Sequence, residues 1–190
     1  MKFKDIPQFT SAGNYEIDVP IGFIKSQIKE YEETYGLEMN PDFQRGNVWT
    51  REQQIAFLEY FFKGGKSALV IYFNHPDFGK GMAKDSDLKH MVLVDGLQRL
   101  TALIGFIDNE IPIFGDNYFK DFEDRPRDTS YRLKFNVNDL QYRKEVLKWY
   151  IDMNNGGTVH SSQEINRVQK MLDEELNKSS KSKEKEDYTY

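Results

Sequence analysis

The sequence predicts a protein of the α+β class, in which strands and helices follow one another in a mixed order. One observation supports this class, and two others bound the kind of domain. Apolar runs typical of strands lie among segments whose apolar residues recur at helical spacing. The 190 residues suit one domain, and 38% hydrophobic with 14% aromatic residues can fill its core. The chain has no cysteine, which excludes disulfides, a thiol nucleophile and a cysteine-ligated metal.

The N-terminal part predicts a strand and then a helix. Residues 15–19 fit a short strand, and Pro20 suits the first turn of a helix over 20–35. Isoleucines at helical spacing give this helix one apolar face, and Gly36 ends it. Residues 37–46 are expected to be extended and rich in turns, because a residue that precedes proline avoids the helical region.

A capping box opens the next predicted helix. Thr50 and Gln53 fit the pattern S/T-x-x-E/Q, and Gly64–Gly65 end the helix. We expect its apolar stripe at Ile55, Leu58 and Phe62. Continuous apolar runs at 68–73 and 91–94 predict two buried strands, and the second leads into a helix over "LQRLTALIGFID".

The C-terminal part predicts one further strand and two helices. Residues 111–114 are a candidate strand in an irregular stretch, and 131–137 alternate as a half-buried strand does. A helix is expected over 139–153. Ser161 and Glu164 form a second capping box, which opens a helix to about residue 177.

These elements predict four parts of the chain. Residues 1–14 form an N-terminal arm, 15–138 the main domain, 139–177 a helical extension and 178–190 a charged, disordered tail. No stretch has the roughly 18 apolar residues of a membrane helix, and the first residues lack a signal-peptide pattern. A cytoplasmic location is therefore expected.

The charge and the histidines argue against two kinds of function. A net charge of −5 disfavours a protein that coats nucleic acid generally, although it leaves room for a local basic groove. The three histidines, His75, His90 and His160, are scattered and show no ligand spacing. A histidine-based metal site is therefore not expected.

Three polar stretches interrupt the apolar pattern where elements begin or end. They are "NPDFQRGNVW" (40–49) before the capped helix, "DGLQR" (95–99) between a strand and a helix, and "NNGG" (154–157) between two helices. A helix start exposes unpaired main-chain amides and a partial positive charge. The stretch DGLQR therefore favours a phosphate site.

The side chains of this stretch have the chemistry that such a site needs. Gly96 allows a ligand to approach the main chain closely, and the guanidinium of Arg99 can pair with two phosphate oxygens. Asp95 suits three roles: it could cap the helix, hold Arg99 in place, or bind a divalent cation beside a phosphate. Gln44 and Arg45 repeat this chemistry at the other helix start. If the two junctions face each other, they form one anion-binding cleft.

An interpretation without a ligand fits the same residues. Asp95 would then cap its helix, Gly96 would make the turn, and Arg99 would pair with an acid elsewhere. Glycines after a helix, as in NNGG, form an ordinary C-cap. Trp49 suits a core position more than a platform for a nucleic-acid base. The residues alone leave both interpretations open.

The ordered set of three stretches resembles a known family. "MNPDFQRGNVWTREQQIAFLEYFFKG", "VLVDGLQRLTAL" and "YIDMNNGGTVHSSQEI" look like signatures of the N-terminal domain of GmrSD-type modification-dependent restriction enzymes, within the ParB/sulfiredoxin-like superfamily. The resemblance covers roughly residues 15–175. The signature of that family, DGQQR, is matched at Asp95, Gly96, Gln98 and Arg99.

The resemblance implies a ParB/sulfiredoxin-like fold, a small mixed sheet with packed helices, and a pocket for a nucleoside triphosphate with Mg²⁺. It implies that hydrolysis of this nucleotide serves DNA cleavage. By position, the catalytic candidates are Asp95, Gln98 and Arg99. Arg45 and Arg99 would bind phosphate oxygens, and Asp95 would hold the magnesium or orient the water. The other residues expected to line the nucleotide are Gln44, Gly96, Asn155 and Gly156.

Two departures from the family bear on the function. Leu97 replaces the first glutamine of DGQQR, so binding could survive while hydrolysis weakens. No His-Asn-His nuclease pattern follows the resembling region, so this chain alone is not expected to cut DNA by that route. Besides an NTPase serving restriction, phage biology or defence, two alternatives stay open. One is a non-catalytic module that binds or inhibits a separate nuclease or defence complex, and the other is a ParB-like phosphotransferase.

Overall fold

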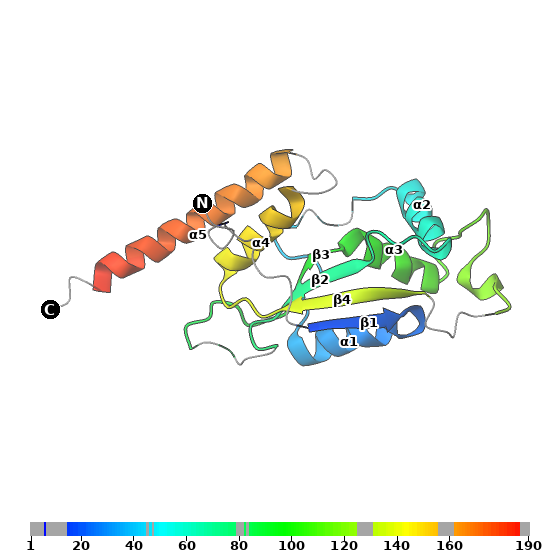
Figure 1. The fold of residues 1–190 in the computed structure, drawn as a ribbon, viewed down its shortest axis with the longest axis horizontal. Helices are drawn as coiled ribbons and strands as arrows, with labels where there is room; N and C mark the ends of the chain where they lie inside the picture. Colours follow the sequence, from blue (N-terminus) through cyan, green and yellow to red (C-terminus); the bar gives the residue numbers. More distant parts are fainter. Residues whose placement is uncertain are drawn as a thin grey trace.

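A computed structural model describes residues 6, 15–44, 46, 48–78, 82, 84–124, 131–155 and 162–186 of the chain (Figure 1). Strands and helices occur in a mixed order, which confirms the α+β class. In chain order the elements are β1 (Tyr15–Pro20), the 3-10 helix η2 (Ile21–Phe23), α1 (Ile24–Tyr35), α2 (Arg51–Phe62), β2 (Val70–Asn74), β3 (Val92–Asp95), α3 (Leu97–Ile107), the 3-10 helix η3 (Phe119–Asp121), β4 (Arg132–Asn138), α4 (Arg143–Asn155) and α5 (Ser162–Glu186).

The strands form one mixed sheet in the order β1-β4-β2-β3. β1 pairs with β4 and β2 pairs with β3 in antiparallel fashion, whereas β2 and β4 are parallel. The register shifts between Tyr72 and Phe73, where β2 meets the end of β3. Such an irregularity re-aims side chains at a strand end. A small mixed sheet was predicted, while its assignment to the ParB/sulfiredoxin-like superfamily stays a prediction.

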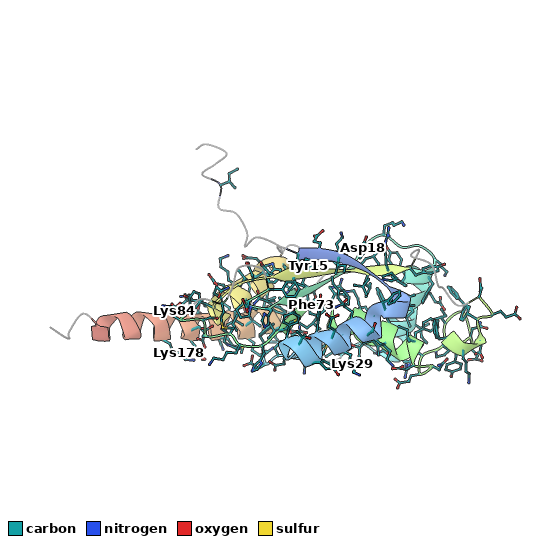
Figure 2. The ribbon with its side chains drawn as sticks, turned by 90° about the horizontal axis from the view of Figure 1, so that it is seen from below. Tyr15, Asp18, Lys29, Phe73, Lys84 and Lys178 are labelled. Atoms are coloured by element: carbon teal, nitrogen blue, oxygen red, sulfur yellow. The ribbon has the colours of Figure 1, made fainter. Side chains whose placement is uncertain are left out.

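One face of the sheet packs against α1, α2 and α3 around the larger core. Ile71 and Phe73 of β2, together with Leu93 of β3, point into this core and are completely buried. The ring of Phe73 lies 5.4 Å from that of Tyr31 on α1, and Figure 2 labels Phe73 between the sheet and this helix. The apolar residues that alternate along β2 therefore attach three helices to one side of the sheet.

The other face packs against α4 and α5 around a second core. Val92 and Val94 of β3 point to this side and belong to one buried cluster with apolar residues of both helices. The ring of Trp149 on α4 lies 5.8 Å from that of Tyr72 on β2. The buried side chain of Asn74 holds the connection to α4, because it exchanges hydrogen bonds of 2.9 and 3.0 Å with the main chain of Leu140.

Several local predictions are confirmed. The predicted first helix is η2 followed by α1, and its isoleucine face is buried. Gly36 ends α1 in the left-handed conformation, with φ of 62°. Thr50 and Gln53 form both bonds of the capping box that opens α2.

Other expectations differ from the structure. The buried positions of α2 are Phe57, Leu58 and Phe61, whereas Ile55 and Phe62 are only partly buried. The candidate strand at 111–114 is reduced to an isolated bridge between Ile113 and Asn117. β4 is buried on both faces from residue 135 onward, and Asn136 on the second face bonds to Glu16 of β1.

The C-terminal helix is longer than predicted. α5 reaches Glu186 instead of ending near residue 177, and both views show its last turns projecting beyond the rest of the molecule (Figures 1 and 2). Ser161 lies outside the described residues. Glu164 is buried and accepts a hydrogen bond of 3.1 Å from the hydroxyl of Tyr150. Its carboxylate therefore joins α5 to α4.

Candidate functional site

The start of α3 is built on a glycine that the fold requires. Gly96 has φ of 108°, in the left-handed region that favours glycine. A Cβ atom at this position would lie 2.5 Å from Cδ1 and 3.3 Å from Cα of Ile71. The turn and the close packing on β2 thus both explain this glycine within the fold. As the N-cap residue, Gly96 brings no side-chain acceptor for the first amides of α3.

The carboxylate of Asp95 pairs with the guanidinium of Arg99 one helical turn later. Arg99 also donates from Nη1 to the carbonyl oxygens of Ala68, at 3.0 Å, and Val70, at 2.8 Å. Its side chain is only 14% exposed. Of the three roles considered for Asp95, the structure shows that it holds Arg99. This pair ties the end of β3 and the start of α3 to the entry of β2.

Gln98 joins α3 to the segment that precedes α2. Its Nε2 donates to the carbonyl of Gly46 at 2.7 Å, and its Oε1 accepts from the amides of Val48 and Trp49, both at 2.9 Å. Gln44, in the same segment, donates from Nε2 to the carbonyl of Leu93 on β3 at 2.6 Å. The two junctions that the sequence singled out therefore lie against each other. Arg45, between these contacts, lies outside the described residues.

Leu97, the residue that departs from DGQQR, is buried. Its side chain is 7% exposed and belongs to the larger core, on the side of the sheet that α1, α2 and α3 cover. Position 97 of this chain is thus an apolar core position.

The third stretch follows the end of α4. Asn155 is the last residue of that helix, while Gly156 lies outside the described residues. Trp149 packs on Tyr72, and Tyr72 is the partner of Asp95 between β2 and β3. At about 1.5 Å per residue, the helix continues roughly 9 Å from Trp149 to Asn155. α4 thus ends beyond its contact with Tyr72.

A comparison with protein families matches residues 24–189 to the GmrSD restriction endonuclease, N-terminal domain. The chain belongs to this family. The suspected membership is therefore confirmed, and it places this GmrSD N-terminal domain in the context of DNA restriction. No curated protein and no solved structure matches it.

The sequence did not predict a row of polar side chains next to Asp95. Across the sheet, Glu16 pairs with Asn136, Asn136 with Tyr72, and Tyr72 with Asp95. Asn136 is 2% exposed and donates to Glu16 at 2.9 Å. Burial raises the pKa of Tyr72, and the charge of Asp95 raises it further while that of Arg99 lowers it. The polar positions of "YRLKFNV" were visible, but their register with Asp95 was not.

The described part of this GmrSD N-terminal domain offers few groups that could hold a metal ion. Within the described part of the chain, no cluster of three or more His, Cys, Asp or Glu side chains could hold a metal ion. Asp95 is a single carboxylate at the start of α3. A single carboxylate fits Mg²⁺ that is bound mainly through substrate phosphates and water.

Among the described helices, none is long and apolar enough to cross a membrane.

Proposed function

We propose that this domain binds a nucleoside triphosphate with Mg²⁺ at the start of α3, within a DNA restriction or defence system. The observation that carries the proposal is the convergence there of two junctions distant in the sequence, one with Gln44 and the other with Asp95 and Gln98. The main-chain amides at a helix start without a side-chain cap are suited to phosphate oxygens. Membership of a restriction endonuclease family supports the setting.

The proposal gives the predicted residues different roles. The amides of α3 and Arg45 bind phosphate oxygens, and Asp95 binds the phosphate-bound Mg²⁺ or orients water. Gln44 and Gln98 position the segment that carries Arg45, as their main-chain bonds indicate. Arg99 supports Asp95 and offers its remaining N–H groups to phosphate. Gly96, Asn155 and Gly156 line the nucleotide.

Binding is tested with labelled ATP, GTP, CTP and UTP in the presence of Mg²⁺. The informative variant is Arg45→Ala, with Arg51→Ala as its control, because Arg51 is an exposed arginine in the first turn of α2. We expect Arg45→Ala to weaken binding at least about tenfold, which corresponds to about 1.4 kcal/mol. We expect Arg51→Ala to bind as the wild type does. Folded wild-type protein that binds none of the four triphosphates would overturn the proposal.

Hydrolysis is tested separately by the release of inorganic phosphate. Asp95→Asn keeps the size of the side chain and removes the charge that would bind Mg²⁺. We expect this variant to lose turnover while circular dichroism shows an intact fold. If the phosphate is transferred to an added acceptor molecule instead of being released as inorganic phosphate, the protein is a phosphotransferase.

A non-catalytic interaction module is the second candidate function. The buried Leu97, together with the main-chain bonds of Gln98 and Arg99, favours it, because the motif then stabilises the domain. This candidate predicts that the protein forms a stoichiometric complex with a separate nuclease subunit. It also predicts that the complex forms equally well without nucleotide, and that neither partner releases phosphate.

A further inference from the structure

The residues just before Arg45 are held by two arginines from the C-terminal helices. Arg167 of α5 donates from Nη1 to the carbonyl of Asp42 at 2.8 Å. Its Nη2 donates to the carbonyls of Phe43 at 2.6 Å and Gln44 at 3.3 Å. Arg143, at the start of α4, donates to both carboxylate oxygens of Asp42 at 2.8 and 2.9 Å.

The bonds of Arg167 fix the main chain and not merely a side chain. One planar guanidinium donates to three consecutive carbonyl groups, a geometry that a compact ammonium group cannot reproduce. The position of Arg167 is itself fixed, because Val168 and Leu172 of α5 are buried against α4. The contact joins distant parts of the chain, because Arg167 and Gln44 are 123 positions apart.

The same segment is also held by the sheet and by α3. The side chain of Gln44 bonds to Leu93 on β3, and the carbonyl of Gly46 bonds to Gln98 on α3. Arg45 lies between these two contacts in the sequence. β3 and α5 thus hold Gln44, and α3 holds Gly46.

We infer that Arg167 is a positioning residue of the candidate site, which holds the segment Asp42–Gln44 in place beside the end of β3 and the start of α3. The C-terminal helix therefore positions a segment of the site, although it contributes no group that touches the ligand. The effect on binding rests on the proposed nucleotide site, whereas the effect on the segment does not.

The segment can be observed without any ligand. The amides of Gln44, Val48 and Trp49 are hydrogen-bonded, so their exchange with deuterium reports the order of residues 42–49. We expect Arg167→Ala to speed this exchange at least about tenfold while the strands of the sheet exchange as in the wild type. Lys170→Ala, an exposed change one turn along α5, should leave the exchange unchanged.

Two further variants show whether Arg167 acts by holding the segment in position or by its positive charge. Arg167→Lys keeps the positive charge and loses the fork, so we expect the segment to stay loose and triphosphate affinity to stay at least about tenfold weaker. Asp42→Asn weakens the bond to Arg143 but keeps the carbonyl that Arg167 binds, so we expect a smaller effect. If Arg167→Lys restores full affinity while the segment remains loose, Arg167 acts by its charge and the inference is wrong.

Two other outcomes would also overturn the inference. One is a folded Arg167→Ala protein whose residues 42–49 exchange at the wild-type rate. The other is a loosened segment with undiminished affinity for triphosphate. If the wild-type protein binds no triphosphate, the proposed function fails, and the exchange measurement alone then decides whether Arg167 positions the segment.

Discussion

The side-chain oxygen of Gln98 lies 2.9 Å from the main-chain nitrogen of Trp49, 49 positions earlier in the chain. The same oxygen accepts from Val48, and the nitrogen of the same amide donates to Gly46. An amide side chain can both donate and accept, which neither a carboxylate nor an ammonium group can do. This relationship explains a glutamine at the start of α3 by the segment that it fastens.

We expect Gln98→Ala to lower the free energy of unfolding by about 1–3 kcal/mol, because it removes three hydrogen bonds and leaves partly covered main-chain groups without a partner. Urea denaturation measures the change. Gln54→Ala is the matched control, since Gln54 is a partly buried glutamine within α2. Equal losses in the two variants would show that Gln98 does not fasten the segment.

Gly96→Ala should be among the most damaging single changes in the domain. It forces a left-handed conformation on alanine and drives Cβ into Ile71. Together these effects should cost at least about 2 kcal/mol of unfolding free energy. Gly22→Ala is the control, because nothing lies within 4 Å of a Cβ added there. The prediction is wrong if both variants unfold at the same urea concentration.

The predictable parts of the fold were those with local signals. Thr50 and Gln53 lie within one helical turn, and Gly36 ends the helix that it directly follows. Such patterns can be read in a single stretch of sequence. The paired junctions at Gln44 and Asp95 could also be named as candidates, because each precedes a helix.

The partners of the site residues could not be predicted. Arg99 bonds to the carbonyls of Ala68 and Val70, and Arg167 bonds to those of Asp42–Gln44. Every residue has a main-chain carbonyl, so a bond to a carbonyl does not require a particular residue type at the acceptor. The sequence therefore cannot reveal which residues accept these bonds. The burial of Leu97 was equally hidden, because it depends on how α3 is rotated against the sheet.

Ala68 is strained, and a glycine there should relieve the strain. Its φ is 57°, and its carbonyl accepts one of the bonds from Arg99. We expect Ala68→Gly to raise the free energy of unfolding by up to about 1 kcal/mol, since the left-handed conformation disfavours alanine by about that amount. The same replacement inside a helix, Ala56→Gly, should lower it by about 1 kcal/mol. Opposite signs in urea denaturation would confirm the strain, and losses of equal size would contradict it.

His75 should make the stability of the domain depend on pH. The residue is 7% exposed, and its Nδ1 accepts a hydrogen bond of 3.2 Å from the amide of Asp77. Burial lowers the pKa of this imidazole below its ordinary value of 6.5, which outweighs the opposite effect of Asp77. Protonation of Nδ1 would also break the bond to the amide. The native protein therefore favours neutral His75.

The sign of the effect follows from this lowered pKa. Above about pH 7 the imidazole is neutral in both states, and its contribution to stability is complete. As the pH falls through 6.5, the unfolded chain takes up the proton first, so stability falls by at most about 1.4 kcal/mol per pH unit. The loss continues until the folded protein is protonated as well.

Urea denaturation between about pH 7.5 and 5.5 measures this dependence, above the range in which ordinary carboxyl groups titrate. His75→Gln removes the titrating group, so we expect a flatter pH profile whatever the variant loses in absolute stability. His90→Gln is the control, because His90 is exposed and its charge is the smallest of the effects on the pKa of His75; this variant should keep most of the wild-type slope. If the pH profile of His75→Gln keeps the wild-type slope, another group causes the dependence and the assignment to His75 is wrong.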